Sequence, residues 1–175
     1  MTRRHTTIDS PLRELTLVAD GGALVGLYFL RHWYRPGGST FGPKVDAASD
    51  PVFAVAARQL GEYFAGERTE FDLATATRGD GFQERVWALV GAVPYGETTT
   101  YGDLAARLGD RSLARDVGAA VGRNPLCVIV PCHRVVGRTG KLTGYAGGVE
   151  RKSALLELEG AVAATALPLF RPGAA

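Results

Sequence analysis

The sequence predicts two small domains, an α/β domain in the first half and a mostly α-helical domain in the second. Near the N-terminus, apolar and polar residues alternate on both sides of a glycine-rich turn, which is typical of a β-hairpin. In the second half, apolar residues recur at helical spacing and the runs stop at Pro and Gly. A short polar linker over residues 75–81 separates the two patterns. We therefore expect domains over residues 1–76 and 77–165, followed by a tail over residues 166–175.

The first half should contain a small antiparallel sheet with one helix. Segments 12–18 and 24–30 flank the turn Asp20-Gly21-Gly22, and this arrangement predicts a hairpin. Residues 35–49 are rich in Gly and contain two Pro residues, so we expect a loop there, and residues 71–73 are expected to form one more short strand. This half shows no cluster of residues that points to catalysis.

Capping residues mark where the helices should begin. Asp50 and Pro51 supply an N-cap and a first-turn proline for a helix that runs to Phe64. The helices expected in the second half cover, in order, residues 82–93, residues 101–108, a segment that runs from the cap at Ser112 through Arg115 to about Gly122, and residues 149–159. Thr100 should cap the second of these helices and Ser112 the third. The second and third are separated by a few residues, which is compatible with a helix-turn-helix.

Composition and charge exclude several classes of protein. The 175 residues are 46% hydrophobic and 22% charged, as in ordinary globular chains, which argues against disorder. A formal net charge of +2 is too small for a histone-like polycation, yet it does not oppose binding to nucleic acid. No apolar run is long enough to span a bilayer and none resembles a secretory signal. We therefore expect a cytoplasmic protein with no membrane partner.

Two cysteines, Cys127 and Cys132, are too few for a disulfide framework, and the three histidines are too scattered for a zinc site, so we expect reduced thiols and no metal. Cys132 follows the apolar run 128–130, which is expected to be a short buried strand. A thiol near pKa 8.5 needs a base, and His133 is adjacent, although contact would require a turn or a bridging water. Glu159 is one candidate among the carboxylates to orient His133. Taken alone, a Cys-His pair after a strand is more often an inert buried thiol with a surface histidine than a nucleophile with its base, and Cys127 is expected to be inert.

Several short blocks in the second half occur in a fixed order. They are Phe82-Gln83, Val86-Trp87, Pro94-Tyr95-Gly96-Glu97-Thr98, Tyr101-Gly102-Asp103-Leu104-Ala105, Asn124-Pro125, Pro131-Cys132-His133-Arg134-Val135, Gly144-Tyr145-Ala146-Gly147-Gly148 and Glu159-Gly160. Over about residues 80–160 the chain thereby resembles the O6-alkylguanine-DNA alkyltransferases, the methylated-DNA–protein-cysteine methyltransferases. The first half matches that family only loosely. The resemblance implies a ribonuclease-H-like first domain and a winged helix-turn-helix second domain.

The resemblance also implies a reaction. An alkyl group would pass from O6 of guanine, and less efficiently from O4 of thymine, to Cys132, once and irreversibly, after the nucleotide is flipped out of duplex DNA. His133 would relay the thiol proton through water and Glu159 would orient His133. Asn124 would brace the turn and Tyr101 would donate a hydrogen bond to the base. The chemistry needs no cofactor and no metal. We expect the protein to be a monomer, and the sequence does not decide whether it binds DNA cooperatively.

Further residues match the DNA-binding and substrate-binding positions of the family. Arg115 matches the arginine that fills the gap left by the flipped nucleotide, on a helix whose small residues allow approach to the minor groove. These small residues are Ala114, Gly118 and Ala119, and the pocket positions are Tyr145, Ala146, Val135, Gly144 and Lys152. The chain departs from the family at Ala146, where many relatives have a polar residue. Asp116 also places a negative charge near the expected phosphates.

Three other functions are alternatives to alkyl transfer. An alkyltransferase-like protein would bind lesions without repairing them, but that class lacks a cysteine at the position of Cys132. A hydrolase using Cys132, His133 and Glu159 would turn over repeatedly on an ester or amide. A transcription factor built on the helix-turn-helix would leave the Pro-Cys-His-Arg block without a purpose.

Overall fold

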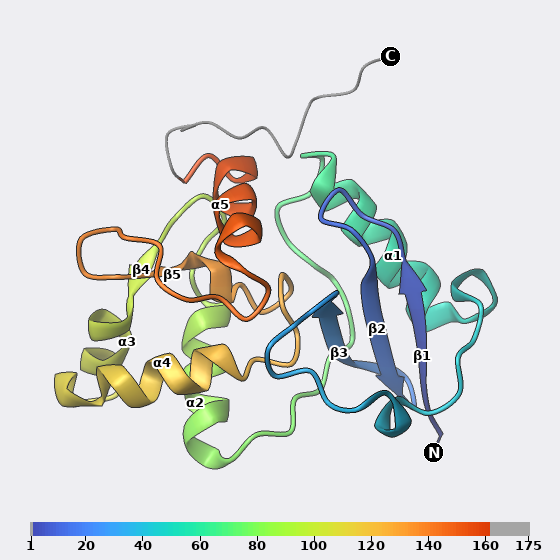
Figure 1. The fold of residues 1–175 in the computed structure, drawn as a ribbon, viewed down its shortest axis with the longest axis horizontal. Coiled ribbons are helices and arrows are strands. Elements are labelled where there is room, and N and C mark those ends of the chain that lie inside the picture. The colour runs from blue at the N-terminus through green and yellow to red at the C-terminus, as the bar shows by residue number, and fades with distance from the viewer. Residues whose placement is uncertain (1, 162–175) are drawn as a thin grey trace.

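The computed structural model describes residues 2–161, so the expected tail over residues 166–175 lies outside the described part. A three-stranded sheet with one long helix lies on one side of the molecule and a group of shorter helices on the other (Figure 1). This arrangement confirms the predicted α/β first domain and the mostly helical second domain.

The sheet is antiparallel in the order β1-β2-β3, with β1 at Arg3–Ile8, β2 at Leu15–Asp20 and β3 at Ala23–Phe29. The predicted hairpin is therefore confirmed as β2 and β3, whereas β1 was not expected from the sequence. Helix α1, Pro51–Phe64, packs against β2 and β3. Its predicted cap is confirmed, because the Asp50 side chain accepts hydrogen bonds from two backbone amides of the first turn. Residues 71–73 form no strand, and this expectation was wrong; the chain there makes only an isolated bridge between Thr75 and Leu24.

The second half contains α2, Gly81–Gly91, α3, Tyr101–Arg107, α4, Ala114–Gly122, and α5, Val149–Leu158. Two residues from each of two segments pair in parallel as β4, Thr99–Thr100, and β5, Val135–Val136. Helices α3 and α4 pack on each other, as a helix-turn-helix requires. Thr100 caps α3 as predicted.

The predicted cap of α4 was wrong. Ser112 lies in a short 3-10 turn, Arg111–Leu113, where its backbone amide donates to the Asp110 side chain. Helix α4 begins after this turn and has no side-chain cap. Asp110 is a good capping residue type two positions earlier, and it took the role that the spacing had assigned to Ser112.

The strand expected at residues 128–130 was also wrong, because this segment is a compact turn. The Asn124 side chain accepts a hydrogen bond from Leu126 N at 2.9 Å and donates to Val130 O at 2.8 Å. At the middle of the turn Val128 has a φ of 72°, a left-handed conformation that a β-branched residue rarely adopts. The side chain of Asn124 thus satisfies the backbone groups that a strand would have paired with a neighbour.

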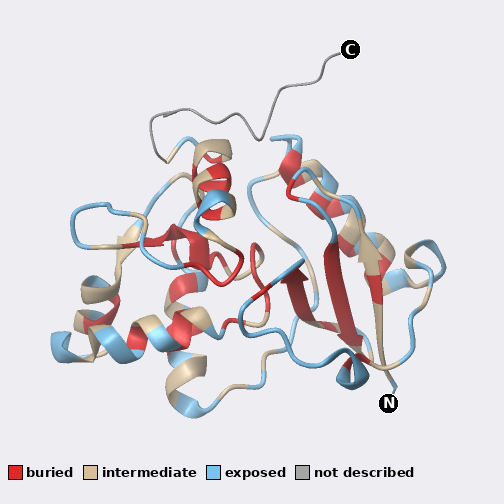
Figure 2. Cartoon of the chain, viewed as in Figure 1, coloured by how far each residue is buried: buried red, intermediate tan, exposed pale blue. Residues whose placement is uncertain are grey.

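One hydrophobic core joins the two halves. Buried residues run from the sheet across to the helical part (Figure 2). At the junction, Leu27 of β3 donates its backbone amide to Pro125 O at 2.8 Å and forms a bridge with Leu126. The turn that follows α4 is therefore fixed against the edge strand β3, and this contact positions the segment that leads to Cys132.

Candidate active site

Cys132 opens a single 3-10 turn, Cys132–Arg134, that follows Pro131. All three residues of this turn are buried, and the side chain of His133 has no exposed area. Asn124 braces the preceding turn by its hydrogen bonds to Leu126 and Val130. The 3-10 geometry lets the adjacent side chains of Cys132 and His133 lie in one buried region, which an extended strand would not allow.

The carboxylate of Glu159 accepts hydrogen bonds from three polar side chains in and next to this turn. It accepts one from His133 Nε2 at 2.8 Å and one from the Tyr63 hydroxyl at 2.6 Å. Arg134 adds a two-pronged contact to both carboxylate oxygens, from Nε at 2.8 Å and from Nη2 at 2.9 Å. Arg134 also donates to Val93 O at 2.6 Å. This buried carboxylate is therefore fully paired, and Tyr63 of α1 links it to the first half.

The hydrogen bonds define the protonation of His133. Burial alone would raise the pKa of Glu159, but the bonds from His133 and Arg134 outweigh it and lower that pKa to about 2. An ionised carboxylate can only accept hydrogen bonds, so Nε2 of His133 carries the proton. Burial lowers the pKa of His133 against the opposing effect of Glu159, which leaves the ring neutral at pH 7. Nδ1 is then unprotonated, and it has no hydrogen-bond partner within residues 2–161.

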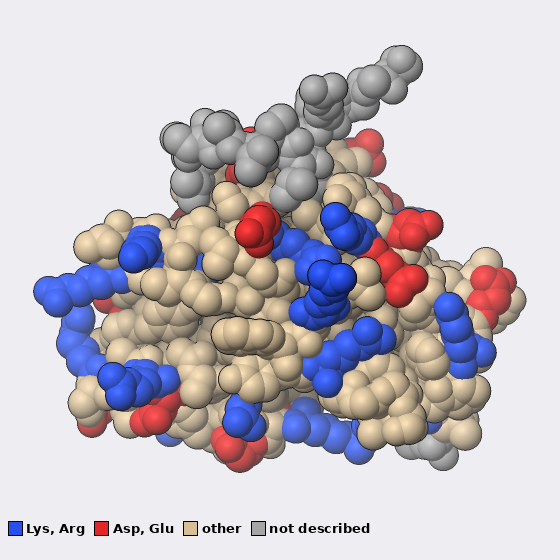
Figure 3. Space-filling model, in the orientation of Figure 1, with Lys and Arg blue, Asp and Glu red and all other residues tan. Residues whose placement is uncertain are grey.

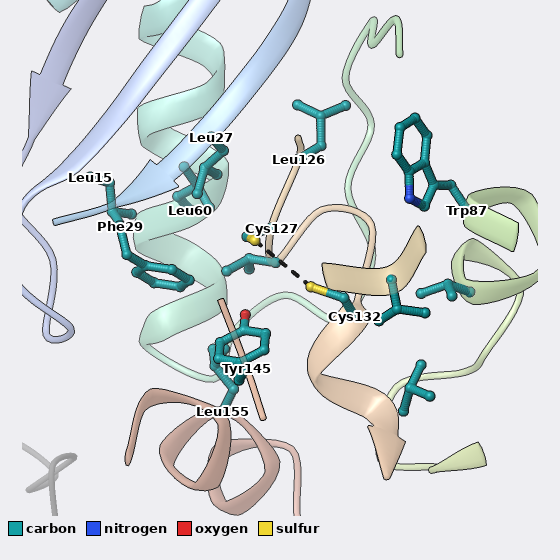
Figure 4. Packing of buried hydrophobic residues seen from close by; sticks show 14 of the residues in the cluster. Leu15, Leu27, Phe29, Leu60, Trp87, Leu126, Cys127, Cys132, Tyr145 and Leu155 are labelled. Atoms are coloured by element: carbon teal, nitrogen blue, oxygen red, sulfur yellow. Dashed lines mark hydrogen bonds between the residues drawn. The ribbon is translucent and has the colours of Figure 1, made fainter. Parts of the chain in front are cut away.

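The two cysteine sulfurs lie side by side. Cys132 Sγ and Cys127 Sγ are 3.7 Å apart, and Figure 4 shows the two sulfurs facing each other with Tyr145 nearby. Hydrogen bonding to Cys127 lowers the pKa of the Cys132 thiol in spite of burial, helped by Asn124, Tyr145 and the charge of Lys152. The same contact and burial raise the pKa of Cys127 well above its usual value. The contact therefore favours ionisation of Cys132 over ionisation of Cys127.

A cavity of about 200 Å³ opens onto Cys132. Of the residues predicted for the site, those that line this cavity are Tyr101, Gly118, Ala119, Cys132, Gly144, Tyr145 and Ala146. Its other lining residues are Trp33, Tyr34, Val121 and Gly122, none of which was expected from the sequence. Trp33 and Tyr34 come from the loop after β3 and are 79% and 50% exposed. Consecutive exposed aromatic residues in a polar loop are a signal that could have pointed to them.

Two predicted pocket residues lie behind the cavity wall. Val135 is completely buried in β5 and Lys152 is completely buried in α5, and neither lines the cavity. Lys152 Nζ donates to Thr143 O at 3.1 Å and lies 5.9 Å from the centre of the Tyr101 ring. Burial lowers the pKa of Lys152 to about 8 and, together with the nearby Cys132, raises the pKa of Tyr101. At neutral pH the pair therefore supplies a buried cation and a protonated phenol.

Helix α4 carries the residues predicted to contact DNA. Arg115 is exposed and makes no ion pair with any described residue, while Gly118 and Ala119 lie at the cavity. Ala114 is half-buried at the start of the helix, and Asp116 lies in its first turn, where the helix dipole favours a negative charge. On the face of the molecule seen in Figure 3, Lys and Arg side chains lie around an uncharged central area.

The described residues contain neither a metal-binding cluster nor a membrane-spanning helix. Residues 2–161 contain no group of three or more His, Cys, Asp or Glu side chains placed to hold a metal ion. Within the same residues, no helix combines the length and the apolar character needed to cross a membrane.

Comparison with known proteins gives matches along both halves of the chain. Residues 3–77 match the family model described as 6-O-methylguanine DNA methyltransferase, ribonuclease-like domain, and residues 81–161 match its DNA binding domain. The chain is 49% identical over 167 residues to a methylated-DNA–protein-cysteine methyltransferase of Mycobacterium bovis, covering 95% of this chain and 98% of the relative. A protein of the same name from Methanosarcina acetivorans is 50% identical over 156 residues, covering 89% and 97%.

A solved structure shows the same fold. The crystal structure of Mycobacterium tuberculosis OGT in complex with DNA is similar to this chain with a TM-score of 0.82 and 50% sequence identity. The similarity covers 89% of this chain and 92% of the other.

Proposed function

The chain belongs to the 6-O-methylguanine DNA methyltransferase family and acts in DNA repair by alkyl transfer, and from this premise we propose that Cys132 is the residue that accepts the alkyl group. The observation that carries the proposal is the buried turn that places the lower-pKa thiol at the cavity and next to His133. Reduced thiols and a DNA substrate favour the cytoplasm as the compartment of this reaction.

The thiolate forms by proton transfer to His133. Nδ1 of His133 is the unprotonated nitrogen of a neutral ring, and a water molecule between Cys132 and His133 would carry the proton to it. Glu159, which Arg134 holds in place, binds the ring at Nε2, and its carboxylate stabilises the imidazolium that results. The charge of Lys152 favours the same ionised state of Cys132.

The alkylated guanine enters the cavity as a flipped nucleotide. Its O6 atom is stacked inside the duplex, and rotation out of the stack costs a few kcal/mol. Exposed on α4, Arg115 is placed to fill the gap in the stack, and Gly118 and Ala119 leave room for the backbone to approach the groove. The apolar walls at Tyr145 and Val121 suit the faces of a purine.

In the chemical step, the Cys132 sulfur forms a bond to the alkyl carbon while the bond between that carbon and O6 breaks. The departing guanine gains one proton, and the thiol has lost one, so the net proton moves from sulfur to base. Tyr101 lies in the cavity with a raised pKa and donates a hydrogen bond that limits negative charge on the leaving purine. The thioether that forms has no readily hydrolysed bond, which makes the reaction a single turnover.

The assignment is tested by a pair of serine variants. Cys132→Ser should lose transfer from duplex DNA with one O6-methylguanine and should retain binding to that DNA in a gel-shift assay. Cys127→Ser is the matched control, because it changes the neighbouring sulfur and should still be methylated on Cys132. Transfer retained by Cys132→Ser, or lost only in Cys127→Ser, would overturn the assignment of the acceptor.

A further inference from the structure

Cys127 lies between the acceptor cysteine and a histidine of the first half. Its sulfur is 3.7 Å from Cys132 Sγ and 3.9 Å from His32 Nε2, and a third contact reaches Asn124 O at 3.9 Å. All of these side chains are buried, with 1% of Cys127 and 6% of His32 exposed. The side chains of His32, Cys127 and Cys132 therefore form a continuous polar chain from the residues just after β3 to the acceptor sulfur, and the part of it that lies beyond Cys127 has no role in the reaction described above.

The direction of the hydrogen bonds follows from His32. Its Nδ1 accepts the backbone amide of Phe29 at 3.4 Å, so this nitrogen carries no proton in the neutral ring. Burial, followed by the charges of Arg151 and Arg35, lowers the pKa of His32 to about 4, and the ring is neutral at pH 7. Nε2 must then hold the proton and donate toward Cys127 Sγ.

Cys127 in turn has its own proton to donate. Its sulfur already receives the N–H of His32, and the contact with Cys132 together with burial raises the pKa of Cys127 well above that of an ordinary thiol. The S–H group of Cys127 can point either to Asn124 O or to Cys132 Sγ. When Cys132 is a thiolate, the charged sulfur is the stronger acceptor.

We propose that Cys127 donates a hydrogen bond to the Cys132 thiolate and that His32 positions Cys127 for this donation, so that the first half of the chain takes part in activating the acceptor. The inference rests on the proposed function, because it takes Cys132 as the acceptor. A neighbouring thiol that shares its proton is known to stabilise a thiolate in paired-cysteine motifs. Here the pair is formed by two cysteines five residues apart across the turn that Asn124 braces.

Other groups face the same sulfur and must be held constant in a test. Tyr145 and Asn124 contact the sulfur of Cys132, Lys152 acts on it through its charge, and Cys132 in turn raises the pKa of Tyr101. His133 follows in the same 3-10 turn. Around Cys127 and His32 the titratable or charged neighbours are Tyr28, Arg151 and Arg35. Substitutions at Cys127 alone leave all of these groups in place. A difference in Cys132 reactivity between the variants therefore measures the effect of the hydrogen-bond donor at residue 127.

The test measures how fast iodoacetamide modifies Cys132 as the pH is varied, without DNA. Wild type, Cys127→Ser and Cys127→Ala are compared, since serine keeps a donor on the β-carbon and alanine keeps none. Trypsin leaves both cysteines in one peptide, residues 124–134, so fragmentation of that peptide must locate the label. We expect the alanine variant to react about tenfold more slowly at pH 7, as a rise of about one pKa unit implies, with the serine variant closer to wild type.

The positioning role of His32 is tested in the same assay. His32→Phe keeps a ring without a donor and should move the pH midpoint of Cys132 labelling upward, whereas His32→Gln keeps an N–H donor and should move it less. A merely structural role would lower the melting temperature of both variants and leave the midpoint unchanged. If the alanine variant does not fold, the wild-type midpoint still decides, because the inference requires a value below the ordinary thiol pKa of about 8.5.

The inference is overturned by equal midpoints in wild type and Cys127→Ala, by equal midpoints in the serine and alanine variants, or by a wild-type midpoint at or above that of a free thiol. The readout is independent of DNA, so it separates the two proposals. A shifted midpoint together with an absence of methyl transfer from DNA would contradict the proposed acceptor and still support the hydrogen bond.

Discussion

Nε2 of His133 and Oε1 of Glu159 are joined by a 2.8 Å hydrogen bond between two side chains with no exposed area. The bond connects the turn that carries Cys132, the proposed acceptor, to the residue just after α5. Because the same carboxylate also pairs with Arg134, one residue near the end of the described chain sets the protonation of His133 and neutralises a buried cation.

Replacing Glu159 should therefore affect both stability and reaction. Glu159→Gln leaves Arg134 as a buried charge with its partner removed, and breaking a buried pair in this way costs about 3–5 kcal/mol of unfolding free energy. It also removes the negative charge that stabilises the protonated ring of His133, so transfer should slow at least tenfold. Urea unfolding and single-turnover transfer from methylated duplex DNA measure the two effects.

Glu62→Gln is the matched control for this substitution. Glu62 accepts hydrogen bonds from Arg58 and Arg68 at the surface of α1, where solvent screens the charges. Its replacement should leave the transfer rate unchanged and the unfolding midpoint nearly so. A Glu159→Gln protein as stable and as fast as the Glu62→Gln protein would contradict the role of Glu159.

The protein should lose stability as the pH falls below about 6.5, the pKa of an ordinary histidine, because His32 resists protonation in the folded state. The pKa of His32 is about 4 in the folded protein and near 6.5 in the unfolded chain, so the unfolded state binds an extra proton between these values. Stability from His32 is complete above about pH 6.5 and is lost toward pH 4, by at most about 3 kcal/mol. Urea unfolding of wild type and His32→Gln at pH 7, 6, 5 and 4 measures it. The variant should lose less stability on acidification, and parallel curves would contradict the expected pKa.

Arg115 should matter only when the target base is in a duplex. Arg115→Ala removes the exposed side chain that we propose fills the vacated stack, so repair of O6-methylguanine in duplex DNA should slow by tenfold or more. The reaction with free O6-benzylguanine needs no flipping and should be unchanged. Arg58→Ala on α1 removes a similar surface charge far along the chain and serves as the control. An equal loss on duplex and free base would argue against the flipping role.

A larger side chain at Gly118 of α4 should fill the cavity. A Cβ on Gly118 would lie 3.7 Å from the Tyr101 ring, an ordinary contact, so Gly118→Leu should fold and place its larger side chain in the space for the base. Methyl transfer should then fall below detection. Gly61→Leu is the control, because Gly61 is also helical and a Cβ there meets no atom within 4 Å. Normal transfer by Gly118→Leu would show that the flipped base does not occupy this cavity.

The sequence predicted correctly the helix starts that depend on capping residues close by in the chain. Asp50, Pro51 and Thr100 act at helix starts as expected, because a cap depends only on the next few backbone amides. Strand β1 was missed since its sequence is mostly charged or polar, and its pairing with β2 is decided by distant residues. The turn at residues 128–130 reads as a strand until the Asn124 side chain is known to bind its backbone.

The site residues of the second half were also predictable from the sequence, whereas those of the first half were not. The order of blocks in the second half pointed to Cys132, His133 and Glu159, which the structure places around one turn. Residues from the first half were not expected, because nothing in the sequence says which of its loops meets the cavity. Tyr63, His32, Trp33 and Tyr34 belong to this group and reach the site through the packing of β3 and α1 against the second half.

The central claim is tested most directly by the stoichiometry and location of methyl transfer in the wild-type protein. Excess duplex DNA with one O6-methylguanine is mixed with a known amount of protein, and the tryptic peptide over residues 124–134 is fragmented to locate the added mass. The account predicts one methyl group per protein molecule, on Cys132, and no further loss of lesion once the protein is consumed. A methyl group on Cys127, more lesions removed than protein molecules present, or an unmodified Cys132 beside intact lesions would contradict it.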